Sequence, residues 1–263
     1  MGDASIREQL SRHLESFVSL PFLFVGSGLS RRYLGTENWR RLLRRFAGYS
    51  DKSFEYYLSS ADGDLPKTAG LLAEDFHDKW WTGSEFEESR KRNGEFAKDR
   101  QSALKIEISS YFQGLEVDEP PSDELKRELE VLRLAVVDGV VTNHWEFLIE
   151  SVVPVYRVFL GQDELLFSVP QGIAEIYKIH GCCTAPHSLV LTDSDYHAFG
   201  ERNAYLASKL LTVFVEHPVI FLGYSLSDPN ILETLGAIAA CAGPERIEDL
   251  RDRLIFVVWD EEE

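Results

Sequence analysis

The 263-residue sequence has few cysteines, no long uninterrupted apolar run and a deficit of positive charge. Its three cysteines, two of them adjacent at Cys182 and Cys183, cannot make the disulfide framework of a small secreted domain. Residues 1–17 are charged and amphipathic, which is unlike a secretory signal. We therefore expect a cytoplasmic protein that works in a reducing compartment.

Long apolar runs are missing as well. The best candidate, residues 211–226, is interrupted by Glu216, His217 and Pro218, so no segment reaches the roughly 20 apolar residues of a membrane helix. The sequence has 44 acidic against 27 basic residues, which gives a formal net charge of −17. Because such a surface repels phosphate backbones and anionic headgroups, the composition predicts neither a nucleic-acid partner nor a membrane surface.

Positive charge is concentrated in one stretch, residues 31–45. Its arginines are Arg31, Arg32, Arg40, Arg41, Arg44 and Arg45. Charge runs of this kind are usually solvated helix faces. The other interpretation is that these arginines attract an anionic cofactor or an acidic partner to the neighbouring glycine motif.

The order of apolar and polar segments predicts an α/β fold. Hydrophobic residues make up 44% of the chain, which suffices for a core. An apolar run at 21–25 leads into a Gly-Ser-Gly turn and a helix, the opening of a βαβ unit. Further strands are predicted at 135–143, 165–169, 175–181, 218–225 and 253–259, and helices at 144–153 and 205–217. Apolar strands alternating with helices indicate a Rossmann-like, mostly parallel sheet with helices on both faces.

The middle of the chain has a different character. Residues 50–130 are rich in helix-forming polar residues with aromatics at helical spacing, and they end in a turn-rich segment. We predict one domain over residues 1–263, with a core at 1–49 and 131–263 and an inserted helical subdomain at 50–130. The sequence stops directly after a predicted strand, so we expect this domain to be the N-terminal part of a longer protein.

Polar clusters follow four of the predicted strands. They are Gly-Ser-Gly-Leu-Ser at 26–30, Thr-Asn-His-Trp-Glu at 142–146, Ile-His-Gly at 179–181 and Gly-Tyr-Ser-Leu-Ser-Asp at 223–228. Because the carboxyl ends of parallel strands meet at one rim, where open sheets bind ligands, we expect these clusters to form a single site.

The glycine turn is the candidate phosphate cradle. Gly26 and Gly28 permit close backbone approach, and the following helix would direct its N–H groups at an anion. The third glycine of the dinucleotide fingerprint is missing, so a plain strand-to-helix turn is the alternative. The 223–228 loop resembles a nucleophile elbow around Ser225, but its second glycine is replaced by Ser227. A ribose- or phosphate-binding loop that uses Gly223, Ser225 and Asp228 suits these residues better.

Histidine and cysteine could supply other chemistry near the third cluster. A lone histidine at a strand end, such as His180, is usually structural. Its position beside three other rim clusters favours a functional role. Cys182, Cys183 and His187 could suggest a metal site, but no Cys-x-x-Cys pair exists, so we expect no zinc.

Taken together, the motifs resemble the sirtuin-like domains of bacterial antiphage defence proteins. The segments that carry the resemblance are FVGSGLS, GTENWRRLL, VVTN, KIHG and FLGYSLSDPNI, the last being the longest match. The helical stretch falls where that family has its helical module. Deacetylating sirtuins carry four zinc cysteines, which this sequence cannot supply. The resemblance therefore points to the branch that hydrolyses NAD.

One motif fits the family in two frames. The family has Thr-Asn-aromatic-Asp, and matching from Thr142 makes Asn143 the catalytic asparagine and puts Trp145 where the acid is expected. Matching from the following Phe-Leu-Ile-Glu puts His144 at the asparagine position and Glu146 at the acid. We prefer Asn143, because it directly follows the predicted strand, and the identity of the acid stays open.

The resemblance implies an NAD glycohydrolase with NAD as its substrate and no metal. Asn143 would orient the ribose and the attacking water, and His180 would act as general base. The implied ligand contacts are Gly26, Ser27, Gly28 and Ser30 on the diphosphate, Ser225 and Asp228 on the adenosine ribose, and also Thr142, Gly223 and Tyr224. The implied biology is NAD depletion during abortive infection by a homo-oligomer that answers a phage trigger or a defence partner.

Two other functional classes are compatible with the residues. The first is a sensing module that binds NAD or ADP-ribose without turnover and regulates an attached effector, which the irregular 142–146 run favours. The second is a dehydrogenase, which would need a substrate domain that the helical stretch does not resemble.

Overall fold

A single parallel sheet forms the centre of the molecule. The computed structural model describes residues 2–117, 120–166, 168, 170–202, 204–226 and 228–257. The sheet has six strands in the order β3-β4-β2-β1-β5-β6, and every pair is parallel. The strands are β1 Phe22–Val25, β2 Gly139–Thr142, β3 Arg157–Leu160, β4 Glu175–Lys178, β5 Val219–Leu222 and β6 Leu254–Val257. The predicted Rossmann-like α/β class is confirmed.

The strand register brings the carboxyl ends of the central strands to one rim. Val25 at the end of β1 pairs with Thr142 of β2 on one side and with Leu222 of β5 on the other. The chain places β2, β4 and β3 on one side of β1, and only later adds β5 and β6 on the other. The loops after β1 and β5 therefore lead to helices on opposite faces of the sheet, and the point where they part is where open sheets of this type bind ligands.

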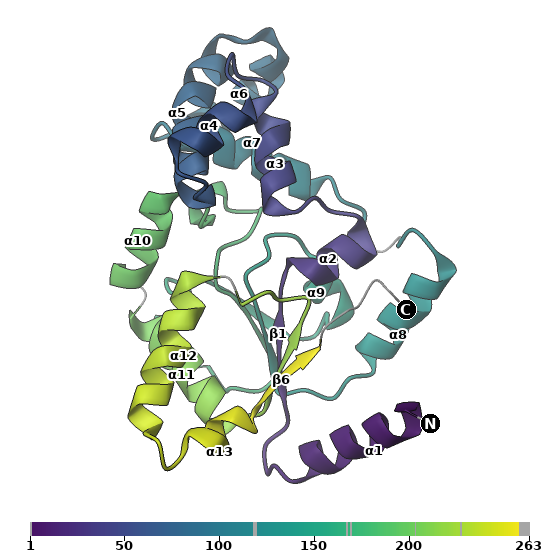
Figure 1. Cartoon of the computed structure of the whole chain (residues 1–263). Helices are drawn as coiled ribbons and strands as arrows, with labels where there is room; N and C mark the ends of the chain where they lie inside the picture. Colours follow the sequence, from purple (N-terminus) through teal and green to yellow (C-terminus); the bar gives the residue numbers. More distant parts are fainter. Residues whose placement is uncertain are drawn as a thin grey trace.

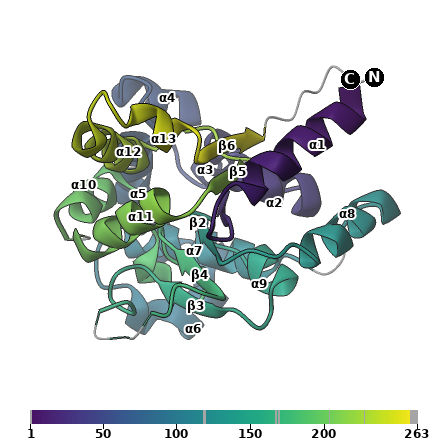
Figure 2. The same cartoon turned by 90° about the horizontal axis from the view of Figure 1, so that it is seen from below.

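Helices cover both faces of the sheet (Figure 2). Leu23 and Val25 of β1 point to the face covered by α2 Ser27–Leu34, α8 Asp123–Arg133 and α9 Leu148–Val152. Phe22 and Phe24 point to the face covered by α11 Ala204–Glu216, α12 Pro229–Ala242 and α13 Ile247–Arg251. This two-residue alternation is the normal side-chain period of a strand buried on both faces. The first helix, α1 Gly2–Glu15, lies at the end of the sheet opposite the rim (Figure 1).

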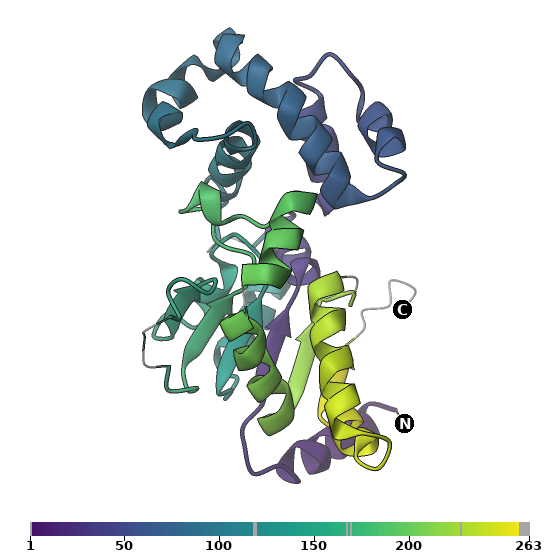
Figure 3. The same cartoon turned by 90° about the vertical axis from the view of Figure 1, so that its left-hand side faces the viewer.

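A helical part stands above the carboxyl rim (Figures 1 and 3). Its helices are α3 Trp39–Ala47, α4 Phe54–Ser60, α5 Leu65–Thr82, α6 Glu87–Asn93 and α7 Ser102–Gln113, with short 3-10 turns at Ser84–Phe86 and Gly94–Phe96. Helices α3, α4, α5 and α7 share one apolar core that includes Phe76 and Trp80, whereas α6 contributes no buried residue. Helix α8, by contrast, packs Leu129 against the sheet. The division into a core and an insertion stays a prediction.

Short polar residues start several of these helices. Asn38, Ser53, Asp64 and Ser122 each accept a hydrogen bond from a backbone N–H in the first turn of the helix that follows. Such N-caps satisfy donors that the helix itself cannot pair, which fixes where each helix begins. In the described part of the chain, no helix is long and apolar enough to span a membrane.

The predicted strand at 165–169 is wrong for the residues that the structure describes there. Leu165 and Leu166 lie in a turn, whereas Phe167 and Val169 fall outside the described residues. Leu165 is fully buried, so its apolar character reflects packing from a turn. The strand on this side of the sheet is β3, which the sequence analysis missed. As an edge strand it is half-exposed and begins with Arg157, so it lacks a continuous apolar signal.

Candidate nucleotide-binding and active site

The glycine turn after β1 is in direct contact with the loop after β5. The Gly26 N–H donates to Leu222 O at 2.9 Å, and the Gly28 N–H donates to Gly223 O at 2.9 Å. A Cβ on Gly28 would lie 2.7 Å from Gly223 Cα, and Gly223 itself has a φ of +59°. Glycine is therefore required at both positions by close backbone approach and left-handed geometry. Helix α2 starts here without a side-chain cap, and its positive end points at this turn, where the Gly28 and Leu29 N–H groups donate to Gly223 O and Gly26 O.

Two pockets flank this turn. The larger, of about 910 Å³, lies between α2, α8 and the ends of β5 and β6, and Gly28 and Gly223 line it. The smaller, of about 110 Å³, lies toward β2 and β4, and Ser27 lines it. The other residues around the smaller pocket are Glu37, Trp39, Leu42, Phe112, Asn143, His144, Trp145, His180, Val190 and Tyr196. The glycine turn thus separates two cavities at the switch point of the sheet.

The smaller pocket is surrounded by buried polar atoms that lack partners. Asn143 Oδ1 and Trp39 Nε1 have no hydrogen bond with any described residue. Tyr224 OH, from the loop after β5, likewise has none with a described residue, whereas Asp228 Oδ2 and His180 Nε2 lie 3.0 Å apart without an aligned hydrogen bond. A buried polar atom left unsatisfied costs roughly 1–3 kcal/mol, so such a cluster indicates a site completed by a ligand.

His180 follows β4 by two residues and is 3% exposed. The Trp145 indole N–H donates to the backbone oxygen of His180 at 3.0 Å. The His180 ring meets the rings of Tyr196 and Phe199 edge-on. Its Nε2 lies 3.0 Å from Asp228 Oδ2. Burial acts to raise the pKa of Asp228, but the neighbouring imidazole and the backbone N–H groups of α12 outweigh it, so this pKa is lowered.

Glu146 belongs to a second buried network behind the pocket. Its Oε1 accepts a hydrogen bond from the Ser30 hydroxyl at 2.6 Å and lies 3.0 Å from His144 Nδ1. Its other oxygen accepts the N–H of Leu148, which helps to start α9 only there, later than the predicted helix at 144–153. Burial acts to raise the pKa of Glu146, but His144, Ser30 and the Leu148 N–H together lower it to about 2.

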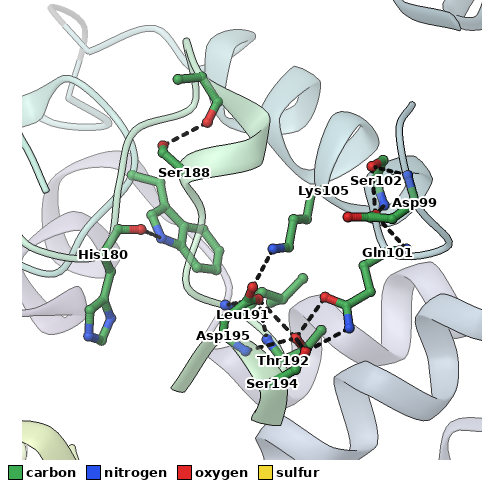
Figure 4. Close-up of polar contacts among 12 residues, drawn as sticks. Asp99, Gln101, Ser102, Lys105, His180, Ser188, Leu191, Thr192, Ser194 and Asp195 are labelled. Carbon is green, nitrogen blue, oxygen red and sulfur yellow. Dashed lines mark hydrogen bonds and ion pairs between the residues drawn. The ribbon is translucent and has the colours of Figure 1, made fainter. Parts of the chain in front are cut away.

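A polar latch joins the helical part to the wall of the smaller pocket (Figure 4). Lys105 of α7 pairs with Asp195 at 2.6 Å, near the start of α10 Asp193–Arg202. Gln101 contacts both Thr192 and Ser194 from the same side. Asp195 also accepts the N–H of Thr192, which closes the turn into α10. The latch therefore fixes the first turn of α10, whose Tyr196 contributes to the pocket wall.

The arginine stretch divides between ion pairs and the larger pocket. Three of its arginines form ion pairs: Arg32 with Glu128, Arg44 with Glu55, and Arg45 with Glu37. Arg31 and Arg41 line the larger pocket, and neither side chain has an ion pair with a described residue. The paired arginines thus fit the interpretation as a solvated helix face, whereas Arg31 and Arg41 lie where they could attract an anionic ligand.

The predicted site residues are distributed unevenly. The structure brings together Gly26, Ser27, Gly28, Gly223, Asn143 and His180 around the two pockets. Four others contact protein groups. The Ser30 hydroxyl donates to Glu146, and the Thr142 hydroxyl accepts the N–H of His144. The Tyr224 ring packs on Phe24 and Phe221, and the Asp228 carboxylate faces His180. Ser225 is exposed, and Ser227 lies outside the described residues. Sequence reasoning did not single out Tyr196, whose position depends on the latch.

The adjacent cysteines belong to a core. Cys182 and Cys183 are buried in the apolar cluster of the helical part, while His187 is exposed. Among the described residues, no group of three or more His, Cys, Asp or Glu side chains could hold a metal ion. The absence of a metal requirement stays a prediction.

The fold and its two rim pockets define a Rossmann-like α/β domain. Residues 148–262 match the family model of the SIR2-like domain. Over 229 residues the chain is 24% identical to the NAD(+) hydrolase ThsA of Cytobacillus dafuensis, and the match covers 85% of this chain but 39% of that protein. Residues 148–262 are therefore similar to the SIR2-like domain, and the chain is a distant homologue of NAD(+) hydrolase ThsA, of whose length it spans well under half. The predicted sirtuin-like resemblance is confirmed.

Proposed function

We propose that this protein is an NAD glycohydrolase, which breaks the bond between nicotinamide and ribose. The observation that supports this most strongly is that Asn143, whose buried Oδ1 has no partner among the described residues, and His180 meet at the smaller pocket beside the glycine turn. An amide and an imidazole next to an anion-binding turn are the groups needed to orient a ribose and to activate water. The name of the distant homologue, an NAD(+) hydrolase, agrees with this assignment.

The two pockets lie on the two sides of the glycine turn, where the two halves of a dinucleotide would bind, although the smaller, at about 110 Å³, must widen to hold a nicotinamide riboside. In the proposed complex the diphosphate lies at the glycine turn, against the positive end of α2, which has no side-chain cap. The adenosine occupies the larger pocket beside Gly223, and the nicotinamide riboside occupies the smaller pocket beside Asn143 and His180. This arrangement follows the general rule that ligands cross the switch point of an open parallel sheet.

The proposed reaction is a hydrolysis at C1 of the ribose. The glycosidic C–N bond breaks and its electron pair goes to the cationic nicotinamide nitrogen, so the leaving group needs no proton. Water then forms a C–O bond with the oxocarbenium-like carbon. His180 takes a proton from that water as general base, and the Asn143 amide orients the water and the ribose hydroxyls. The products are nicotinamide and ADP-ribose.

Two further parts of the proposal concern the cell. By analogy with antiphage proteins of the sirtuin-like class, the reaction would deplete NAD in abortive infection. It would take place in a homo-oligomer that responds to a phage trigger or a defence partner.

The alternative is a sensor that binds NAD or ADP-ribose without turnover. Because a general base must reach the substrate, the burial of His180, which is only 3% exposed, favours this alternative, and nicotinamide release distinguishes the two.

ADP-ribose is expected to stabilise the folded protein. A ligand that binds only the native state at about 100 times its dissociation constant adds roughly 2.7 kcal/mol. For a domain of this size, that corresponds to a rise in Tm of roughly 5–10 °C. The measurement is differential scanning fluorimetry with ADP-ribose, which the enzyme does not consume, and with free ribose as the control. An unchanged Tm at millimolar ADP-ribose would argue against the dinucleotide site.

Removing the unpaired arginines of the larger pocket should weaken binding without slowing the chemistry. Arg31→Ala and Arg41→Ala each remove one exposed cation, so we expect each to raise the Kd for ADP-ribose roughly two- to fivefold. The effect should shrink at high salt, because exposed charges are screened. Isothermal titration at two salt concentrations measures this, with Arg44→Ala, whose side chain pairs with Glu55, as the matched control. Kd values equal to that of the wild type for all three variants would mean that these arginines do not attract the diphosphate.

A further inference from the structure

Asp228 has surroundings that its expected role as a ribose ligand does not explain. It is the N-cap of α12, where one carboxylate oxygen accepts the Asn230 N–H at 3.0 Å. Its other oxygen, Oδ2, lies 3.0 Å from His180 Nε2, and the two side chains are only 5% and 4% exposed. Neither of these two atoms has a well-aligned hydrogen bond with any described residue. A buried carboxylate thus faces the proposed general base at contact distance.

The groups around the pair are neutral phenols. Tyr196 of α10 and Tyr224 of the β5–α12 loop both face Asp228, and burial, reinforced by the carboxylate charge, raises the pKa of each. They therefore keep their protons at neutral pH and add no charge to the pocket. The pKa of Asp228 is lowered despite its burial, so the carboxylate stays ionised beside the imidazole.

We propose that Asp228 is the positioning residue of His180, a role that rests on the proposed hydrolase function. A carboxylate 3.0 Å from Nε2 favours the tautomer that carries its proton on Nε2. The lone pair of the other ring nitrogen is then available to accept a proton from the attacking water. When that proton arrives the ring becomes cationic, and the buried charge of Asp228 stabilises it. The proton afterwards leaves the ring to solvent, which restores the starting state.

This role differs in a measurable way from ribose binding. A ribose ligand contributes to the affinity for ADP-ribose, and its loss weakens binding of substrate and product. A positioning residue acts on the base, so its loss lowers kcat and leaves the affinity for ADP-ribose almost unchanged. The two roles therefore separate in kcat and Kd.

The test is Asp228→Asn in the full chain. Asparagine is nearly isosteric and is itself a good N-cap, so α12 should keep its first turn. We expect kcat to fall by at least about 10²-fold, whereas the Kd for ADP-ribose changes by less than about threefold. Asp228→Ser, which also caps helices but has no carboxylate, should behave in the same way. Asp249→Asn, an exposed aspartate of α13, is the control and should leave both quantities unchanged.

A spectroscopic measurement makes the test independent of turnover. In protein labelled with ¹⁵N-histidine, the ring-nitrogen signals of His180 should report the Nε2–H tautomer in the wild type and a mixture of tautomers in Asp228→Asn. Identical His180 signals in both proteins would overturn the proposal, even if NAD is hydrolysed. A parallel loss of ADP-ribose affinity with unchanged kcat would overturn it in favour of ribose binding. If the wild type releases no nicotinamide, the hydrolase function fails, and the tautomer shift still decides whether Asp228 positions His180.

Discussion

His180→Ala is expected to lose NAD cleavage by a factor on the order of 10²–10⁴ while keeping its fold. The ring is buried at the end of β4 and lines the smaller pocket, so its removal takes away the proposed base. Binding of ADP-ribose should change much less, because the diphosphate and adenosine contacts lie at the glycine turn and in the larger pocket. Initial rates of nicotinamide release measure the first effect, and calorimetric titration measures the second.

The control for His180→Ala is His187→Ala. His187 is an exposed histidine seven residues further along the same loop, so the same substitution there should leave the rate near that of the wild type. Asn143→Ala should also lose most activity, because its amide oxygen is buried at the pocket without a partner among the described residues. His144→Ala tests the other frame of the motif. If Asn143→Ala turns over normally and His144→Ala is inactive, then His144 occupies the catalytic position.

Glu146→Ala is expected to produce the largest loss of stability. The carboxylate is 3% exposed, and its loss would leave Ser30, His144 and the Leu148 N–H without their shared acceptor. Breaking a buried charged network by removing one partner typically costs about 3–5 kcal/mol. In a domain of this size, that is a fall in Tm of roughly 10 °C or more. Chemical denaturation of Glu146→Ala and of the surface control Glu88→Ala, which removes an exposed ion pair, measures the difference.

The same carboxylate predicts how stability depends on pH. Its pKa is lowered from 4.5 to about 2 in the folded protein, so its contribution is fully present above about pH 4.5. The contribution, on the order of 3 kcal/mol, should disappear as pH falls from about 4.5 toward 2. The wild type should therefore approach Glu146→Gln in unfolding free energy over that interval. A constant difference between the two proteins from pH 7 to pH 3 would contradict this account of the network.

Much of the fold could be predicted because its strands are buried on both faces. The run before Gly26 is continuously apolar and ends in a glycine turn, and both properties follow from its place at the centre of the sheet. Strand β3 could not be predicted in the same way, because it is an edge strand with only Phe159 fully buried. Leu165 shows the converse, an apolar residue that is buried from a turn.

The site was predictable only to the level of its loops. Four clusters at strand ends predicted a common rim, and the register of β1 with β2 and β5 accounts for that convergence. The sequence could not indicate that Asp228 faces His180, because the contact joins two loops that are 48 positions apart in the chain. Tyr196 was likewise unpredictable, since its place depends on the ion pair between Lys105 and Asp195. Contacts of this kind are set by tertiary packing and leave no local pattern.

Release of nicotinamide from NAD tests the central claim most directly. The full-length, assembled protein is incubated with NAD, and nicotinamide and ADP-ribose are separated and quantified over time, with His180→Ala run in parallel. The proposed mechanism predicts equimolar nicotinamide and ADP-ribose from the wild type and at least about 10²-fold less from the variant. If the wild type binds NAD and releases no nicotinamide in any assembly state, the protein is a sensor and the hydrolase assignment is wrong.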